Sequence, residues 1–305
     1  MYDEPNQLWQ RFAALTRNAY MDKLLLLATN GLIWGLIIAL IALGLSIIFG
    51  LLDIINIAHG DFFMVGTVLA WAILRSTGSF WPAFILVPLI GFVLGALIQR
   101  VVIQPIHNAA ALSIVATFGL SLILQEGVRM TFGPTPRRIL PPIHGTIGLF
   151  GVEYEVYRLF AAVVSIAALG AFFAFLRSTK LGTWMRAVRH DRDTALAMGI
   201  PANRIYVLTF AIGFGLAALG GVVAAPITTV DFRGGVDILP FCFMAVIIGG
   251  LGNLLGTAAA AILLAFLEGI IQSFADPTAA RIASLVLMSA VLLLRPQGLF
   301  KGLAR

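Results

Sequence analysis

Long apolar runs constrain this chain more than any other feature of its sequence. The first run covers residues 24–52 and exceeds the roughly 20 residues that a helix needs to cross a bilayer. Because the bilayer core offers the backbone no water to bond with, such runs have to form helices. The sequence therefore predicts an all-α, polytopic transmembrane helical bundle. The further runs are 62–74, 81–103, 109–128, 156–176, 205–225, 239–274 and 282–294.

Two of these apolar regions are interrupted, and the interruptions decide the number of crossings. The polar patch DIINIAHGD, residues 53–61, precedes the run 62–74, which is too short to cross alone as a straight helix. A Gly-rich stretch, residues 249–253, divides the run 239–274. Discontinuous helices at both places explain the pattern and predict eight to nine crossings.

Composition agrees with a bilayer as the main solvent, because 60% of the residues are apolar and only 11% are charged. The single cysteine, Cys242, excludes a disulfide framework within the chain and a cysteine-rich metal site. Residues 1–22 form a polar N-terminal segment that lacks the features of a cleaved signal, and we expect it to be retained. Residues 23–305 then form one transmembrane domain.

Lys and Arg in short loops predict the orientation of the bundle. The loop 177–204 carries six such residues and the tail carries Arg295, Lys301 and Arg305, so both are assigned to the cytoplasm. Arg137 and Arg138, in the outer loop, run against this rule. Span 205–225 then exits outward, and region 239–274 has to cross twice to return the tail to the inside.

Small residues recur at four-residue spacing, and such pairs allow helix backbones to approach closely in lipid. We expect tight helix packing at each pair. The pairs are Gly31 with Gly35, Gly91 with Gly95, and Gly252 with Gly256.

The patch around His59 is the first candidate site, because ionisable residues between two apolar runs are costly to bury without partners. One interpretation is a discontinuous helix whose polar groups line a translocation pathway, with Gly60 permitting the break. The other is a short interfacial loop, and the sequence leaves both open. A metal site is not expected, since none of the four histidines has a helical partner at the right spacing. The candidate residues are Asn56, His59, Gly60 and Asp61.

The stretch GGLGNLLG supplies the second set of pathway candidates, Gly249, Gly250 and Asn253. It is not a nucleotide loop, because no Lys follows its last Gly and no acidic ribose partner is in place. No Gly-Lys-Ser or Gly-Lys-Thr step occurs in the sequence, and nucleophile or metal-protease motifs are absent as well. The chain is therefore expected to be no enzyme, to bind no cofactor or metal, and to leave any ATP hydrolysis to partner subunits.

The polar loop 186–205 predicts a short capped helix. Asp191 and Asp193 precede an apolar turn, where carboxylates favour a helix N-terminus. Gly199 is expected to close the helix and Pro201 to prevent its continuation. With exposed Ala, Met and Ile side chains this helix would suit a groove on a partner protein, although a solvated connecting loop is the alternative.

Charged residues near the ends of the runs are interpreted as side chains that reach the membrane interface. They are Glu126, Arg129, Glu268 and Asp276. A proton or sodium relay would need several carboxylates at mid-span, and only Glu268 is deep enough. An ion-coupled secondary transporter, which also uses broken helices, therefore stays as the alternative class.

Four motifs together resemble a known family. They are IINIAHGDFFMVG at 54–66, RAVRHDRDTALAMGI at 186–200, AVIIGGLGNLLG at 245–256 and LLLRPQGLF at 292–300. In this order they are similar to the branched-chain amino acid permease of bacterial ATP-binding-cassette importers, the LivH type. The resemblance spans residues 30–300, and the motif around Met198 is shared with ribose-type permeases.

The resemblance implies a half-pore in the bacterial inner (plasma) membrane. Its partners would be a second homologous permease subunit, two cytoplasmic ATPase subunits and a periplasmic substrate-binding protein, with no nucleic acid. The patch from Asn56 to Asp61 would be a helix break beside the pathway. Leucine-like amino acids are the expected solute, with urea, short amides and aromatic acids open as alternatives. The ATPase coupling helix would comprise Asp193, Ala195, Met198, Gly199 and Ile200.

Overall fold

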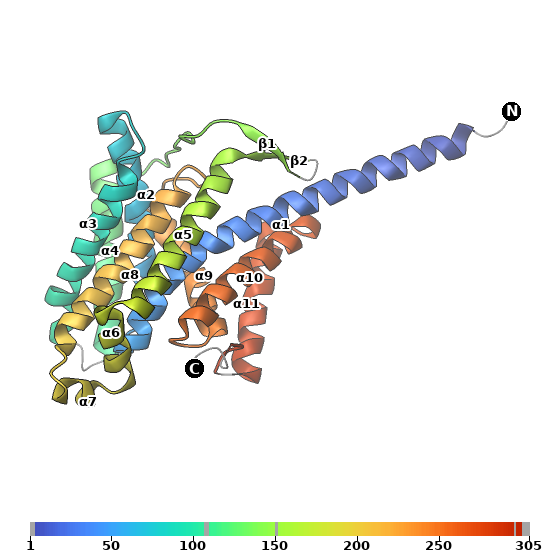
Figure 1. Ribbon diagram of the computed structural model, residues 1–305. Helices are drawn as coiled ribbons and strands as arrows, with labels where there is room; N and C mark the ends of the chain where they lie inside the picture. Colours follow the sequence, from blue (N-terminus) through green and yellow to red (C-terminus); the bar gives the residue numbers. More distant parts are fainter. Residues whose placement is uncertain (1–3, 107–109, 150–151, 296, 301–305) are drawn as a thin grey trace.

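The computed structural model describes residues 4–106, 110–149, 152–295 and 297–300, and shows a bundle of long helices with a β-hairpin at one end (Figure 1). Residue 22 lies inside the first helix, so no element ends at the expected boundary of the polar N-terminal segment. The long helices are α1 (Glu4–Leu52), α2 (His59–Thr77), α3 (Ala83–Ile98), α4 (Ala110–Phe132), α5 (Val156–Ser178), α8 (Ala202–Ala224), α9 (Gly234–Gly249), α10 (Leu254–Phe274) and α11 (Pro277–Leu294).

Shorter elements connect these helices. The helical turns η1 (Gln99–Ile103) and η2 (Gln104–Ile106) extend α3, and α6 (Lys180–His190) and α7 (Arg192–Ala197) lie between α5 and α8. The strands β1 (Thr146–Leu149) and β2 (Val152–Glu155) pair antiparallel, with Thr146 opposite Glu155.

Seven helices in the described part of the chain are long and apolar enough to cross a membrane, which confirms the polytopic helical bundle. They are α1 from Met21 onward, α3 with its extension, α4, α5, α8, α10 and α11. The shorter apolar helix α9 and the helix α2 are not among the seven. The eight to nine crossings expected from the sequence would need one or both of these helices as well.

The bundle has two distinct ends. The β-hairpin lies at one end, called the hairpin face, and α6, α7 and the described end of the chain lie at the other, called the α7 face (Figure 1). Packing fixes the direction of each helix: Gly91 lies against Ala218 and Gly95 against Phe214, so α3 and α8 run antiparallel. In the same way Gly31 meets Ala265, and α1 and α10 run antiparallel.

Eight of the long helices fall into two groups of four, α1–α4 and α8–α11, and the third helix of each group packs on the first helix of the other. Helix α10, the third of the second group, packs on α1, while α3, the third of the first group, packs on α8. The first helices α1 and α8 cross at Gly44 and Gly213, and a Cβ atom on either would meet the carbonyl oxygen of the other. Because α1 runs toward the α7 face and α8 runs away from it, the groups have opposite orientations (Figure 1). The bundle thus contains an inverted-topology repeat, an architecture that many transporters use.

The predicted close packing at small residues is confirmed at α1 and α3. A Cβ atom on Gly31 or Gly35 would overlap the backbone of α10, and one on Gly91 or Gly95 would meet Phe214 or Ala218 of α8. Gly252 differs, because it lies in a turn with a positive φ of 77° and belongs to no helix.

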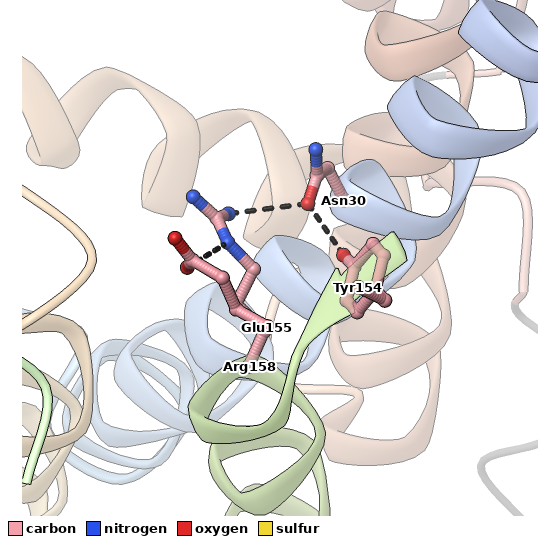
Figure 2. A network of polar contacts seen from close by, with 4 residues as sticks. All are labelled: Asn30, Tyr154, Glu155 and Arg158. Carbon is pink, nitrogen blue, oxygen red and sulfur yellow. Dashed lines mark hydrogen bonds and ion pairs between the residues drawn. The ribbon is translucent and has the colours of Figure 1, made fainter. Parts of the chain in front are cut away.

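The hairpin holds the beginning of α5 against α1 (Figure 2). The Tyr154 hydroxyl donates a hydrogen bond to Asn30 Oδ1, and Arg158 Nη1 donates to the same oxygen at 3.1 Å. Arg158 Nε also pairs with Glu155 Oε2 at 3.0 Å. Burial raises the pKa of the Tyr154 hydroxyl above its ordinary value, so this group stays a neutral donor at physiological pH.

Arg137, an exception to the loop-charge rule, is fixed in place at the hairpin face. Its backbone pairs with Val230 through two hydrogen bonds of 2.8 Å, and its guanidinium lies 4.8 Å from the Trp71 ring centroid. A cation held over an aromatic face is stabilised where it lies.

Candidate translocation site and coupling surface

The first helix break returns the chain into the middle of the bundle. Helix α1 ends at Leu52, and Asp53 adopts a positive φ of 53°. Six residues later His59 Nε2 lies 2.9 Å from the carbonyl oxygen of Ile41, about 16 Å back along α1. Between them the chain has no regular secondary structure at residues 53–56 and forms a turn at residues 57–58. The buried residues of the return are Ile54, Asn56 and Ala58.

His59 anchors the beginning of α2 against α1 and α8. Its side chain is fully buried, and its ring stacks on Phe214 near the middle of α8, with centroids 5.8 Å apart. Because a carbonyl oxygen can only accept, the bond to Ile41 places the proton on Nε2. The other ring nitrogen, Nδ1, has no partner among the described residues. Gly44 leaves room for the ring, since a Cβ atom there would lie 3.0 Å from His59 Cε1.

Asn56 forms a local turn within the same break. Its Oδ1 accepts from the backbone N–H of Ala58 at 3.1 Å, a local turn that Asn side chains favour. The Asn56 side chain is fully buried, and Nδ2 makes no hydrogen bond to the described part of the protein.

Asp61, in the first turn of α2, is bound by α4. It is 2% exposed, and its Oδ1 accepts from Gln125 Nε2 at 3.0 Å. Gln125 also donates to Ser121 at 2.9 Å, and one turn earlier Thr117 accepts from the backbone N–H of Ile57 at 3.2 Å. A carboxylate here also complements the positive end of α2.

Sequence reasoning missed these α4 partners. Thr117, Ser121 and Gln125 follow one another at four-residue spacing, which places them on one face of a helix. That polar stripe, in an otherwise apolar run, was the available signal.

Helix α9 begins beside the beginning of α2 and points the opposite way. A Cβ atom on Gly60 would overlap the carbonyl oxygen of Gly235, and one on Gly235 would lie 2.7 Å from Asp61 Cα. Gly60 was expected to permit the helix break, but it lies inside α2, and what it permits is this close approach. Two helix N-termini therefore meet at mid-height in the bundle, where their dipoles present positive ends.

The second break lies at the α7 face. Helix α9 ends at Gly249, Gly250 has a φ of 97°, and Asn253 caps α10 by accepting from the Gly256 N–H at 3.1 Å. Asn253 Nδ2 also donates to the carbonyl of Phe300 at 2.7 Å, which ties the turn to the chain's last described residues.

The structure thus brings Asn56, His59, Gly60 and Asp61 together at mid-height and places Gly249, Gly250 and Asn253 elsewhere. The structure confirms that the Gly-rich stretch divides this apolar region into two helices, α9 and α10. The pathway roles of both groups stay predictions.

The predicted capped helix in the polar loop is α7. The Asp191 side chain accepts from the backbone N–H groups of Asp193 at 2.9 Å and Thr194 at 3.0 Å. A hydrogen bond from the Thr194 hydroxyl, together with these backbone bonds, lowers the pKa of Asp191 below its ordinary value. Asp193 lies in the first turn and is not the cap.

The end of α7 closes as the sequence predicted. Gly199 has a φ of 79°, its N–H donates to Leu196, and the Ile200 N–H donates to Ala195, each at 3.0 Å. This pair of bonds is the Schellman motif, which satisfies the last carbonyls of a helix.

The exposed surface of α7 differs from the expectation at two residues, Ala195 and Ile200. Met198 is 79% and Leu196 43% exposed, whereas Ala195 is 3% exposed and packs in the core. Ala195 is buried because the helix turns that side toward the bundle. Ile200 is half-buried.

Seven apolar spans, an inverted repeat and helix beginnings buried at mid-height define a multi-pass membrane permease. A family model described as branched-chain amino acid transport system, permease component, matches residues 27–295. The chain belongs to this family, as the motifs suggested.

Relatives with high coverage agree. The chain is 27% identical over 292 residues to the high-affinity branched-chain amino acid transport system permease protein LivH of Salmonella typhimurium, covering 88% of this chain and 93% of the relative. It is 28% identical over 290 residues to BraD of Pseudomonas aeruginosa, with the same coverage. The ribose import permease protein RbsC of Haemophilus influenzae is 28% identical over 247 residues, 75% of this chain and 72% of the relative. No solved structure matches the chain.

These matches confirm the resemblance and the permease role predicted from the sequence. The family consists of transport permeases and not of enzymes. Together with the seven spans, it also confirms a multi-pass protein of the inner (plasma) membrane.

Proposed function

We propose that this chain forms half of the translocation pathway of an ATP-driven importer for branched-chain amino acids. A second homologous permease subunit forms the other half, two cytoplasmic ATPase subunits bind and hydrolyse ATP, and a periplasmic substrate-binding protein delivers the solute. This chain itself carries no cofactor. The family description, which names one component of a transport system, supports an assembly of several subunits.

The observation that carries the proposal is the α7 surface. A six-residue helix, capped at both ends and tipped by the exposed Met198, lies at the face opposite the hairpin. A rigid helix with an apolar tip suits a groove on a partner, because little conformational entropy is lost on docking. The Arg-rich segment around it supports a cytoplasmic assignment of the α7 face.

The bundle makes nine passes in this proposal. Residues 53–77 make one pass, from the α7 face to the hairpin face. The next interrupted pass begins at Val230, at the hairpin face. Its first segment reaches mid-height, and α9 continues from there to the α7 face. Each of the nine passes then runs opposite to the one before it. This alternation places α7 and the C-terminal tail on the same side of the membrane. The pathway runs beside the paired beginnings of α2 and α9, where Asn56, His59 and Asp61 position the helix ends.

Branched-chain amino acids are the proposed solute because the LivH and BraD relatives cover more of the chain than the ribose permease does. Urea or a short amide is the alternative within the same architecture.

Coexpression with the ATPase and binding-protein partners tests the proposal. We expect ATP-driven uptake of radiolabelled leucine into proteoliposomes, and loss of both uptake and ATPase co-purification in Met198→Asp. The docking affinity should fall at least tenfold, since an apolar anchor in a groove contributes about 2 kcal/mol or more. Leu140→Asp, at a site 81% exposed on the hairpin face, is the matched control and should recover the ATPase as wild type does.

Equal recovery of the ATPase with Met198→Asp and Leu140→Asp would refute α7 as the docking helix. Leucine uptake by the lone chain, driven by an ion gradient without ATP, would instead favour the ion-coupled alternative.

A further inference from the structure

A cavity of about 520 Å³ opens near the hairpin face, away from the paired helix beginnings. It lies between α1, α10 and α11, with Phe241 of α9 in its wall. Its volume falls in the range of sites for small ligands, roughly 300 to 1,000 Å³. Both charged and apolar side chains line it, which is unusual for a space among membrane helices.

Glu268 places a carboxylate in this cavity. The residue is 7% exposed, so its side chain lies inside the bundle. The Gln272 side chain, one turn along α10, interacts with it, and the charge of Arg281 acts on it from α11. A carboxylate taken out of water needs close cationic or hydrogen-bonding partners, and these leave it only partly compensated.

Arg281 places the opposite charge in the same cavity. Its guanidinium lies 4.8 Å from the Phe241 ring centroid and makes no hydrogen bond to a described residue. No ion pair within 4 Å joins Arg281 to Glu268 in the described part of the chain. The five N–H donors of this side chain are therefore available to an acidic group.

We infer that this cavity binds a small zwitterion, with an ammonium group toward Glu268 and an acidic group toward Arg281. The two charges face one cavity without an ion pair within 4 Å, so each can pair with the opposite group of one bound molecule. Thr278, three residues before Arg281, adds a hydroxyl to the cavity. Trp34 and Leu27 give it an apolar wall. Asn30, whose Oδ1 is occupied by Tyr154 and Arg158, joins the cavity to the hairpin (Figure 2).

Two sources supply this chemistry, a free α-amino acid and the headgroup of phosphatidylethanolamine. The amino acid is favoured because an apolar wall adjoins the charged part of the cavity, and an aliphatic side chain needs such a wall. This assignment rests on the proposed function, since it makes the cavity a holding site for the imported solute.

Radiolabelled leucine binding to the full chain in phosphatidylglycerol nanodiscs tests the inference. We expect saturable binding that weakens roughly tenfold or more in Glu268→Gln and in Arg281→Gln, because each removes a charge-assisted hydrogen bond. The matched controls are Glu126→Gln and Arg129→Gln, a half-exposed pair on α4 joined at 3.2 Å, which should bind as wild type. Thermal unfolding checks that every variant is folded.

A second arm identifies the source. One outcome is that native mass spectra show retained phosphatidylethanolamine, that both cavity variants lose it, and that leucine does not bind. This outcome assigns the site to the lipid headgroup. Absence of both ligands, or binding that neither cavity variant changes, overturns the inference. Wild-type leucine uptake by an importer without cavity binding would leave the proposed function standing, whereas absent uptake would count against that function itself.

Discussion

The two helix interruptions look alike in the sequence and differ in the folded chain. Residues 53–58 return the chain to mid-height, and α2 begins there with His59 bonded to Ile41. Residues 250–253 form a turn at the α7 face, with two glycines at positive φ and Asn253 as a cap. At mid-height a buried polar group can bond only to the protein, whereas the second break reaches the surface at Leu251, which is 55% exposed. Depth, and not the break itself, sets the cost of altering each one.

The largest expected effect is at the contact of the two helix beginnings. Gly60→Ala should lower the stability by about 1–3 kcal/mol, because the new Cβ atom would overlap the rigid backbone at Gly235. Gly127→Ala on α4, where no atom lies within 4 Å, is the matched control and should gain up to about 1 kcal/mol from helix propensity. Thermal unfolding in detergent measures both, and equal shifts would contradict the close contact.

A smaller effect is expected at the buried hydrogen bond of the first break. His59→Phe keeps an aromatic ring against Phe214 but removes the bond to Ile41, at a cost of about 1–2 kcal/mol. Denaturation midpoints measure the change. Wild-type stability in this variant would show that the mid-height bond contributes nothing.

Removing the cap at the second break should cost about 1 kcal/mol, the usual loss when a helix N-cap side chain is removed. Asn253→Ala removes the bonds to Gly256 and Phe300, while Asn253→Asp keeps the acceptor for Gly256 and should retain most of the stability. The same denaturation series ranks these variants against His59→Phe. A larger loss here than at His59 would reverse the comparison.

The smallest effect concerns the α7 cap, which is fully exposed to water. The folded pKa of Asp191 is depressed, so its contribution is present above the unfolded pKa and is lost as the pH falls through the folded value. Amide exchange in α7, corrected for intrinsic rates, should therefore stay constant from pH 8 to 5 and rise only below about pH 4. Asp191→Asn should remove this pH dependence, and a midpoint near neutral pH would contradict the assignment.

Much of the fold could be predicted because apolar run lengths report the bilayer directly. The spans, the α9–α10 hairpin and the caps of α7 follow from hydropathy and from Asp191, Gly199 and Pro201. Depth could not be predicted, because a polar patch reads the same at an interface and at mid-height. The pairing of Gly60 with Gly235 was also hidden, since it joins segments far apart in the sequence and no local pattern marks it.

The depth of the two breaks is the most direct test of this account. A nitroxide label at Ile57→Cys and another at Leu251→Cys, in the reconstituted chain, report depth through their relative exposure to oxygen and to a water-soluble nickel reagent. Position 57 lies two residues before His59, and Leu251 is 55% exposed in the second break. We predict a label near the bilayer centre at 57 and one at the interface at 251. Equal, interfacial depths would contradict the paired helix beginnings on which the proposed pathway rests.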